Sequence, residues 1–283
     1  STVARLTRFT ENLNFALSLG YRVVWTMHNL YPHEQPFPHV DRLGRIVVCG
    51  AADHVIAHCE FAAELARKEV HRRDRLHVIP HGNFIDVFPN EISKSKAREQ
   101  LEIPEDAFVY LFFGNARVYK GIEFLIRAFC RVADQDALLA LMMREATIDP
   151  EYAEKLRTLS GSDSRVRVFT SSFFENDEFQ IYLNAADVAV FPFVEVLTSG
   201  SAITALSFGK PVILPKLGCL PELIDETMGI LYDPKEEDGL ERALGAIRER
   251  DLKPAGQAAL ERARNLDWHK IAGRVAEVYR NES

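Results

Sequence analysis

Residues 188–214 read VAVFPFVEVLTSGSAITALSFGKPVIL. The pattern predicts a buried strand, a polar loop that carries one carboxylate, a short apolar helix and a second buried strand. Such a loop in a parallel sheet presents backbone N–H groups and the positive end of the helix dipole at the carboxyl edge of the sheet. We therefore expect the loop 195–201 to hold an anionic group, with a diphosphate as the working hypothesis.

The same alternation of strands and helices runs through the rest of the chain. Near-continuous apolar strands joined by helices are typical of a parallel sheet covered on both faces, so the sequence predicts an α/β protein with doubly wound sheets. Three strands are expected early in the chain, at residues 21–27, 54–58 and 76–80. Six more are expected further along, at residues 108–113, 137–143, 165–170, 188–193, 211–214 and 229–232.

These elements predict two Rossmann-like domains. We expect residues 1–90 to form the N-terminal domain, residues 91–266 the C-terminal domain, and residues 267–283 a helix that packs back towards the N-terminal domain. Residues 1–83 supply fewer strand–helix units than a doubly wound half needs, so we expect the N-terminal domain to be incomplete.

The composition limits the class of protein. The 283 residues are 47% hydrophobic, enough for a large core, and the net charge of −7 argues against a general nucleic-acid-binding protein. No run reaches the roughly 18 apolar residues of a membrane-spanning helix. The four cysteines form no CxxC pair and are expected to be reduced, which predicts a cytoplasmic protein.

One basic cluster stands out against the acidic balance of the chain, at Arg67, Lys68, Arg72, Arg73 and Arg75. It predicts either a solvated helix end or contact with an anionic membrane surface. The second interpretation would place the protein peripherally on the inner face of the plasma membrane.

A second candidate anion site follows the first strand of the later domain, where residues 114–121 read GNARVYKG. Arg117 and Lys120 lie three positions apart, between the end of a strand and the start of a helix. Two cations and a helix dipole at one point suit a diphosphate and the charge that develops when it leaves. The alternative is a solvated turn with two ordinary cations. Because the loop 195–201 is expected at the same sheet edge, we favour the diphosphate.

Several other residues have both a functional and a structural interpretation. Glu195 is the only carboxylate of its loop, and it could hydrogen-bond sugar hydroxyls or stay solvated. Residues 199–201 could bind an anion or cap the helix that follows. His28 and His81 each end a predicted strand, and each could serve a site or be structural. No histidine spacing matches a metal-ligand pattern, so we expect no metal site.

Taken in order, these motifs resemble the retaining glycosyltransferases of family four (glycosyl transferases group 1), which have the GT-B fold of two facing Rossmann-like domains. The resemblance covers nearly the whole chain from Gly20. The segments that resemble family motifs are 26–29 (TMHN), 78–83 (VIPHGN), 114–121, 195–212 and 218–222 (GCLPE).

The resemblance implies roles for particular residues. Arg117 and Lys120 would bind the nucleotide diphosphate, Glu195 would contact the donor sugar and His28 would line the sugar site. Thr204 stands where the family has its second glutamate, and Asn115 where it has its arginine. The further candidates for binding the donor are Gly114, Asn115, Phe173, Phe174, Thr198, Ser199, Gly200, Ser201 and Thr204, with Phe173 and Phe174 expected beside the nucleobase.

The implied activity is transfer of a sugar from a nucleotide diphosphate sugar, linked to UDP or GDP, to a hydroxyl of a glycan or a lipid-linked glycan, with retention of configuration. The resemblance implies a hexosyltransferase of polysaccharide biosynthesis that needs no cofactor and no metal. Two alternatives stay open: a nucleotide-sugar epimerase of the same fold, and a non-catalytic fragment that binds a nucleotide sugar.

Overall fold

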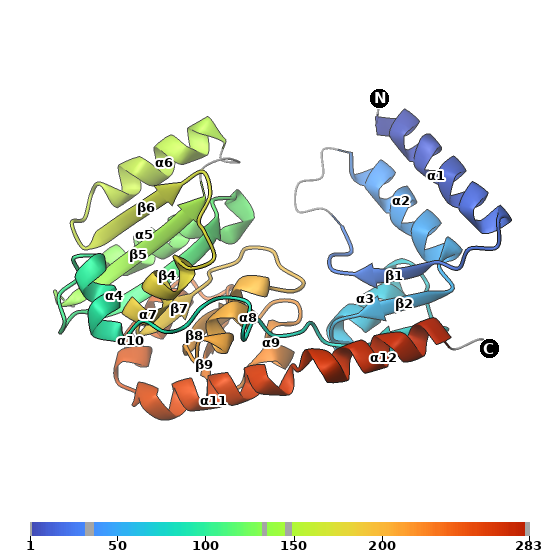
Figure 1. Ribbon diagram of the computed structural model, residues 1–283. Helices are drawn as coiled ribbons and strands as arrows, with labels where there is room; N and C mark the ends of the chain where they lie inside the picture. Colours follow the sequence, from blue (N-terminus) through green and yellow to red (C-terminus); the bar gives the residue numbers. More distant parts are fainter. Residues whose placement is uncertain (1, 32–36, 132–134, 145–148, 281–283) are drawn as a thin grey trace. The chain divides into compact units, whose positions relative to one another are not determined.

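The computed structural model describes residues 2–31, 37–131, 135–144 and 149–280. The chain divides into two compact units (Figure 1). Unit 1 comprises residues 1–82, 196–198 and 266–283, and unit 2 comprises residues 83–195 and 199–265.

Unit 1 is built on a small parallel sheet with the strand order β1-β2-β3. Its strands are β1 (Val24–Met27), β2 (His54–Ala57) and β3 (Leu76–Val78). Its helices are α1 (Thr2–Ser18), α2 (Pro38–Ala51), α3 (Glu60–Glu69) and α12 (Trp268–Arg280).

The two faces of this sheet pack against different helices, because neighbouring strand residues point to opposite faces. Val55 packs with Cys49 of α2 in one apolar cluster. Ile56 packs with Ile271 and Val278 of α12 in another. The C-terminal helix is therefore part of the core of unit 1 (Figure 1).

Unit 2 contains a parallel sheet with the strand order β6-β5-β4-β7-β8-β9. The chain runs outward from β4 to one edge, returns, and then runs from β7 to the other edge, so the order reverses between β4 and β7. This is the doubly wound arrangement, in which ligands bind beyond the carboxyl ends of the strands at the reversal. The strands are β4 (Phe108–Asn115), β5 (Ala137–Arg144), β6 (Val166–Ser171), β7 (Val188–Val190), β8 (Val212–Pro215) and β9 (Gly229–Tyr232).

Helices cover both faces of this sheet. Tyr110 of β4 contacts Phe129 of α5 and donates from its hydroxyl to the Leu244 carbonyl of α10. Phe113 of the same strand contacts Phe179 of α7, on the opposite face. The helices of unit 2 are α4 (Lys94–Gln100), α5 (Ile122–Arg131), α6 (Pro150–Ser160), α7 (Phe179–Ala185), α8 (Gly200–Ser207), α9 (Leu220–Leu223), α10 (Gly239–Arg248) and α11 (Leu252–Asn265), with a short 3-10 helix η1 (Val118–Lys120).

The predicted fold class is confirmed: the protein is α/β with two parallel sheets, of which the first is small. All nine predicted strands are present; β1 and β3 are shorter than expected, and so is β7. Phe191 still donates from its N–H to Ile213, but Pro192 has no N–H with which to continue the ladder. No helix among the described residues is long and apolar enough to cross a membrane.

The prediction that the cysteines are reduced is correct for two of the four. Cys49 and Cys130 are free thiols. The prediction is wrong for Cys59 and Cys219, which are not free.

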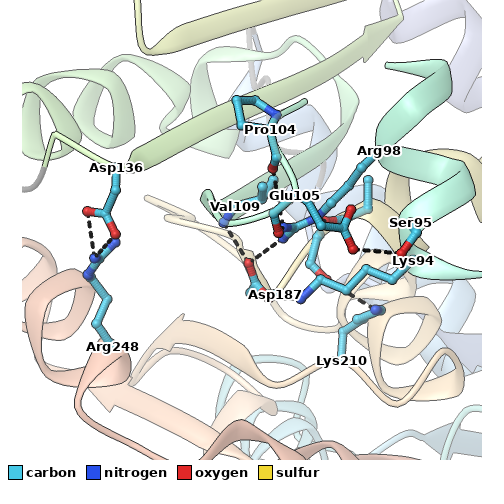
Figure 2. Close-up of polar contacts among 12 residues, drawn as sticks. Lys94, Ser95, Arg98, Pro104, Glu105, Val109, Asp136, Asp187, Lys210 and Arg248 are labelled. Atoms are coloured by element: carbon cyan, nitrogen blue, oxygen red, sulfur yellow. Dashed lines mark hydrogen bonds and ion pairs between the residues drawn. The ribbon is translucent and has the colours of Figure 1, made fainter. Parts of the chain in front are cut away.

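A buried ion pair anchors the end of the unit 2 sheet where β4 begins (Figure 2). The Asp187 carboxylate accepts from Arg98 at 2.9 Å, from Lys94 at 2.5 Å and from the Val109 N–H at 2.7 Å. The Arg98 side chain is almost fully buried, and its Nε also donates to the Ala185 carbonyl. This network ties α4 to the first residues of β4 and to the start of β7.

A second cation lies close to this network (Figure 2). Lys210 donates from Nζ to the Ala186 carbonyl at 3.1 Å. Burial lowers its pKa to about 8, and the charges of Lys94 and Arg98 act in the same direction, whereas Asp187 opposes them. Asp187 is therefore the carboxylate that balances three neighbouring cations.

We predict that Asp187→Ala destabilises unit 2 by about 3–5 kcal/mol, because it leaves the buried Arg98 guanidinium without its counter-charge. The matched control is Asp136→Ala, which removes an Asp–Arg248 pair whose carboxylate is 59% exposed (Figure 2). We expect that change to cost about 1 kcal/mol or less. Urea unfolding followed by circular dichroism measures both, and equal losses would contradict the assignment.

Candidate functional site

The candidate site lies at the carboxyl edge of the unit 2 sheet, beyond β4 and β7. Two loops leave this edge: residues 116–121 after β4, whose last two residues belong to the predicted segment 114–121, and residues 191–199 after β7. These are the two loops that the sequence predicts to hold a diphosphate. The reversal of strand order between β4 and β7 brings their starting points together.

The two loops approach so closely that one position has no room for a side chain. A Cβ placed on Gly121 would lie 2.1 Å from the carbonyl oxygen of Pro192, and Gly121 has φ +68°, in the left-handed region. The Val194 N–H donates to the Tyr119 carbonyl at 2.9 Å. Glycine at 121 is therefore what allows the loop after β4 to dock on the loop after β7.

Lys120 is held inside this junction. Its Nζ lies 4.6 Å from the centre of the Phe193 ring and 5.3 Å from that of Tyr119, within the range of cation–π attraction. Burial lowers the pKa of the Lys120 ammonium to about 8. Because neither ring can neutralise the charge, an anion at this point would relieve the cost of burial.

Arg117 and Glu195 also belong to these loops. Arg117 is half-buried and immediately precedes η1, where its carbonyl accepts from the Lys120 N–H at 2.9 Å. Glu195 is exposed. Their roles in binding diphosphate and sugar stay predictions.

The hydroxyl residues at the start of α8 and within it make different contacts. Ser199 is buried, and its hydroxyl accepts from the Ala202 N–H at 3.1 Å, so it is the cap of α8. Thr204 is also buried, and its hydroxyl donates to the Gly200 carbonyl within the helix. The Ser201 hydroxyl lies nearest the position that a Cβ on Gly114 would take, at 3.8 Å. Ser201 therefore brings the first turn of α8 to the end of β4.

A cavity of about 260 Å³ opens beside this edge. Its wall includes four of the predicted residues: Gly114 and Asn115 from the phosphate loop, and Phe173 and Phe174 from the predicted nucleobase loop. The structure therefore brings together two segments that are more than 50 residues apart in the sequence.

Five residues of the cavity wall were not predicted from the sequence, and Phe88, Phe179 and Arg144 are three of them. Phe88 stacks on Phe179 with ring centres 4.6 Å apart. Arg144 ends β5 opposite Asn115, donates from Nε to the Ser172 carbonyl at 2.9 Å, and lies over the Phe173 ring at 5.4 Å. The sequence signal for Arg144 was its position at the end of a strand next to β4.

The other predicted residues belong to unit 1. His28 follows β1, and its carbonyl accepts from the Thr198 hydroxyl at 3.1 Å. His81 follows β3, and its ring lies 5.8 Å from that of Trp268 of α12. Between them lies His58, which the sequence did not single out and whose Nε2 is 3.1 Å from Nδ1 of His28.

The basic cluster of unit 1 is partly occupied by internal contacts. Arg72 donates to the Asp53 carbonyl, and Arg67 pairs with Glu64. Membrane contact through this cluster stays a prediction. Across the described residues, no group of three or more His, Cys, Asp or Glu side chains is arranged to hold a metal ion.

Comparison with known proteins supplies the family. The sequence model described as Glycosyl transferases group 1 matches residues 107–249. The one described as Glycosyltransferase Family 4 matches residues 9–84. The two matches fall in the two units of the structure.

Two curated relatives are both named D-inositol 3-phosphate glycosyltransferase. The one from Xylanimonas cellulosilytica is 28% identical, over 91% of this chain and 66% of the relative. The one from Streptomyces scabiei is 28% identical, over 92% of this chain and 63% of the relative. The chain thus spans less than two thirds of the length of these relatives.

Solved structures are similar to the chain over nearly its whole length. Sucrose-phosphate synthase from Thermosynechococcus elongatus is 26% identical with a TM-score of 0.80, over 94% of this chain and 70% of that one. HepE of Anabaena, solved with UDP-glucose, is 21% identical with a TM-score of 0.80, over 95% of this chain and 74% of that one. At that identity HepE supports the fold alone.

We predict that Gly121→Ala separates the two loops and destabilises unit 2 by about 2 kcal/mol or more, from the left-handed backbone and the contact with Pro192. Gly245→Ala is the control, because a Cβ there meets nothing within 4 Å and the residue lies within α10. That change should stabilise the protein by about 0.5–1 kcal/mol. Thermal unfolding of both variants measures these changes in stability. An unfolding temperature of Gly121→Ala equal to that of the wild type would contradict the close approach of the two loops.

We predict that Lys120→Met stabilises unit 2 at pH 7 by about 1 kcal/mol, since it removes a charge held at a cost. The folded-state pKa of Lys120 is about 8, below its ordinary 10.5, so between these pH values the unfolded wild type binds more protons and the wild type gains stability as the pH rises. The advantage of Lys120→Met should therefore shrink from pH 8 to pH 10.

The control for this measurement is Lys96→Met, which changes an exposed lysine of α4. Urea midpoints recorded across this pH range should show no such trend for the control. A gain for Lys120→Met that does not change with pH would contradict the buried ammonium.

Proposed function

The chain belongs to the glycosyl transferases group 1 family, and from this premise we propose that it transfers a sugar from a nucleotide diphosphate sugar to a hydroxyl group, with retention of configuration. UDP or GDP carries the sugar in this proposal. The acceptor is a hydroxyl of a glycan or a lipid-linked glycan. The hydroxyl-bearing acceptor is consistent with the name of the two curated relatives.

The observation that carries the proposal is the cavity at the end of β4. It joins the predicted phosphate loop to the predicted nucleobase loop within one unit. A base beside Phe173 and Phe174 would be bound by apolar and stacking contacts, and a diphosphate beside Gly114 would extend towards the junction that holds Lys120. Because HepE was solved with UDP-glucose, UDP is the first nucleotide to test.

In the proposed reaction, the bond between the anomeric carbon and the diphosphate oxygen breaks while the acceptor oxygen bonds to the same carbon from the same face. The proton of the acceptor hydroxyl passes to the departing diphosphate. Lys120, Arg117 and the first turn of α8 stabilise the charge that develops on it. Because Lys120 is already desolvated, its attraction to that charge is stronger than in water.

The role proposed for Lys120 fits its low pKa. A buried ammonium destabilises the free protein, and an anion that neutralises it recovers part of that cost as binding free energy. His28 and Glu195 would contact the transferred sugar. The proposal requires no metal, because side chains and a helix dipole supply the positive charge.

Calorimetry with UDP, GDP and ADP tests the nucleotide site. We expect UDP or GDP to bind, Lys120→Met to weaken that binding at least tenfold, and Lys96→Met to leave it unchanged, because a charge-assisted contact contributes about 1.5–3 kcal/mol. The same affinity in Lys120→Met and wild type would refute the phosphate site. Unchanged binding in EDTA is expected as well.

Product analysis tests the reaction. We expect slow hydrolysis of the sugar nucleotide when no acceptor is present, and a glycoside of the original anomeric configuration when one is supplied. An epimerised sugar nucleotide would indicate an epimerase instead. Binding with no turnover in any mixture would indicate a non-catalytic nucleotide-sugar-binding chain.

A further inference from the structure

Three histidines of unit 1 lie together at the carboxyl edge of its sheet. His28 follows β1, His58 follows β2 and His81 follows β3. The His58 ring lies between the other two, with its centre 4.9 Å from that of His28 and 5.6 Å from that of His81. The proposed function uses His28 alone and gives His58 no role.

The hydrogen bonds of His58 determine which of its ring nitrogens carries a proton. Its Nδ1 lies 2.9 Å from the Ile79 carbonyl oxygen, which can only accept, so Nδ1 is the protonated nitrogen. Burial lowers the pKa of His58, against the opposing effect of the Ile79 carbonyl, and this favours the neutral ring at pH 7. In a neutral ring with a proton on Nδ1, Nε2 carries a lone pair and can only accept.

The protonation of His58 in turn determines that of His28. Its Nδ1 lies 3.1 Å from that accepting Nε2 of His58, so Nδ1 of His28 must donate. Burial and the neighbouring His81 charge lower the pKa of His28, so it too is neutral at pH 7. Nε2 of His28 is then its unprotonated nitrogen. The Ile79 carbonyl thus fixes the tautomers of two rings in series.

We propose that His58 is a positioning residue which holds His28 in the Nδ1–H tautomer, so that Nε2 of His28 accepts a hydrogen bond from a hydroxyl of the sugar substrate. The second half of this inference rests on the proposed function, and the tautomer itself does not. The assignment also defines the chemistry of the recognised group. A bare imidazole nitrogen binds a group that offers a hydrogen, such as a hydroxyl, and disfavours a carboxylate or phosphate at that position.

Nitrogen-15 NMR of the histidine rings in the full 283-residue chain tests the tautomer directly. At about pH 7.5, above the ordinary histidine pKa, we expect wild-type His28 to show a protonated Nδ1 and a bare Nε2. A proton on Nε2 of His28 in the wild type would overturn the proposal.

Two substitutions of His58 separate positioning from packing. His58→Gln keeps one acceptor and one donor in its amide, and should preserve the His28 tautomer. His58→Phe keeps a ring of similar shape without either group, and should leave His28 exchanging between its two tautomers. His77→Gln is the matched control, because His77 pairs with His54 at 2.9 Å through the same kind of ring-to-ring hydrogen bond. His28 signals that stay unchanged in His58→Phe would overturn the proposal.

Binding of UDP-glucose, relative to UDP, tests the contact with the sugar. We expect His58→Phe to lower this ratio of affinities about twofold or more, because only the fraction of His28 in the Nδ1–H tautomer can accept from the sugar, and to leave UDP binding unchanged. His58→Gln should restore the wild-type ratio. The same ratio in His58→Phe and wild type would overturn the role in sugar binding. Failure of the wild type to bind either UDP or GDP would refute the proposed function, while the NMR result would still decide the tautomer.

Discussion

The geometry of unit 2 at its candidate site depends on the close approach of two loops at the reversal of strand order. Gly121 lies against the Pro192 carbonyl where no side chain fits, and the Val194 N–H donates to Tyr119 across the same junction. This contact buries Lys120 against Phe193. A glycine that has no room for a methyl group thus determines where the most perturbed cation of the loops lies.

The two ends of the unit 2 sheet use buried charge in opposite ways. At the start of β4, Arg98 is paired with Asp187 and satisfied by backbone carbonyls, so its charge is balanced and the network is structural. At the carboxyl end, Lys120 lies against aromatic rings, and burial lowers its pKa to about 8. No ion pair of Lys120 is found among the described residues, and a buried cation of this kind is typical of a site that binds an anion.

Much of the fold could be predicted from the sequence, because nine apolar strands alternate with helices and Gly121 and Ser199 have local signatures. The cavity wall could not be predicted from the sequence. Phe88 and Arg144 line the cavity only because the fold brings distant strands and loops next to one another. Thr204 was predicted from a position in a family motif, and the structure shows its hydroxyl engaged within α8. His58 ends a predicted strand as His28 and His81 do, but its importance lies in a hydrogen bond that no sequence pattern reports.

The central claim is that the edge of the sheet beyond β4 and β7 binds a nucleoside diphosphate. The most direct measurement is a crystal structure of the chain with UDP. The account predicts the base in the cavity beside Phe173 and Phe174, with the diphosphate next to Gly114 and within hydrogen-bond distance of Lys120. A nucleotide bound elsewhere on the protein, with this cavity filled by solvent, would contradict it.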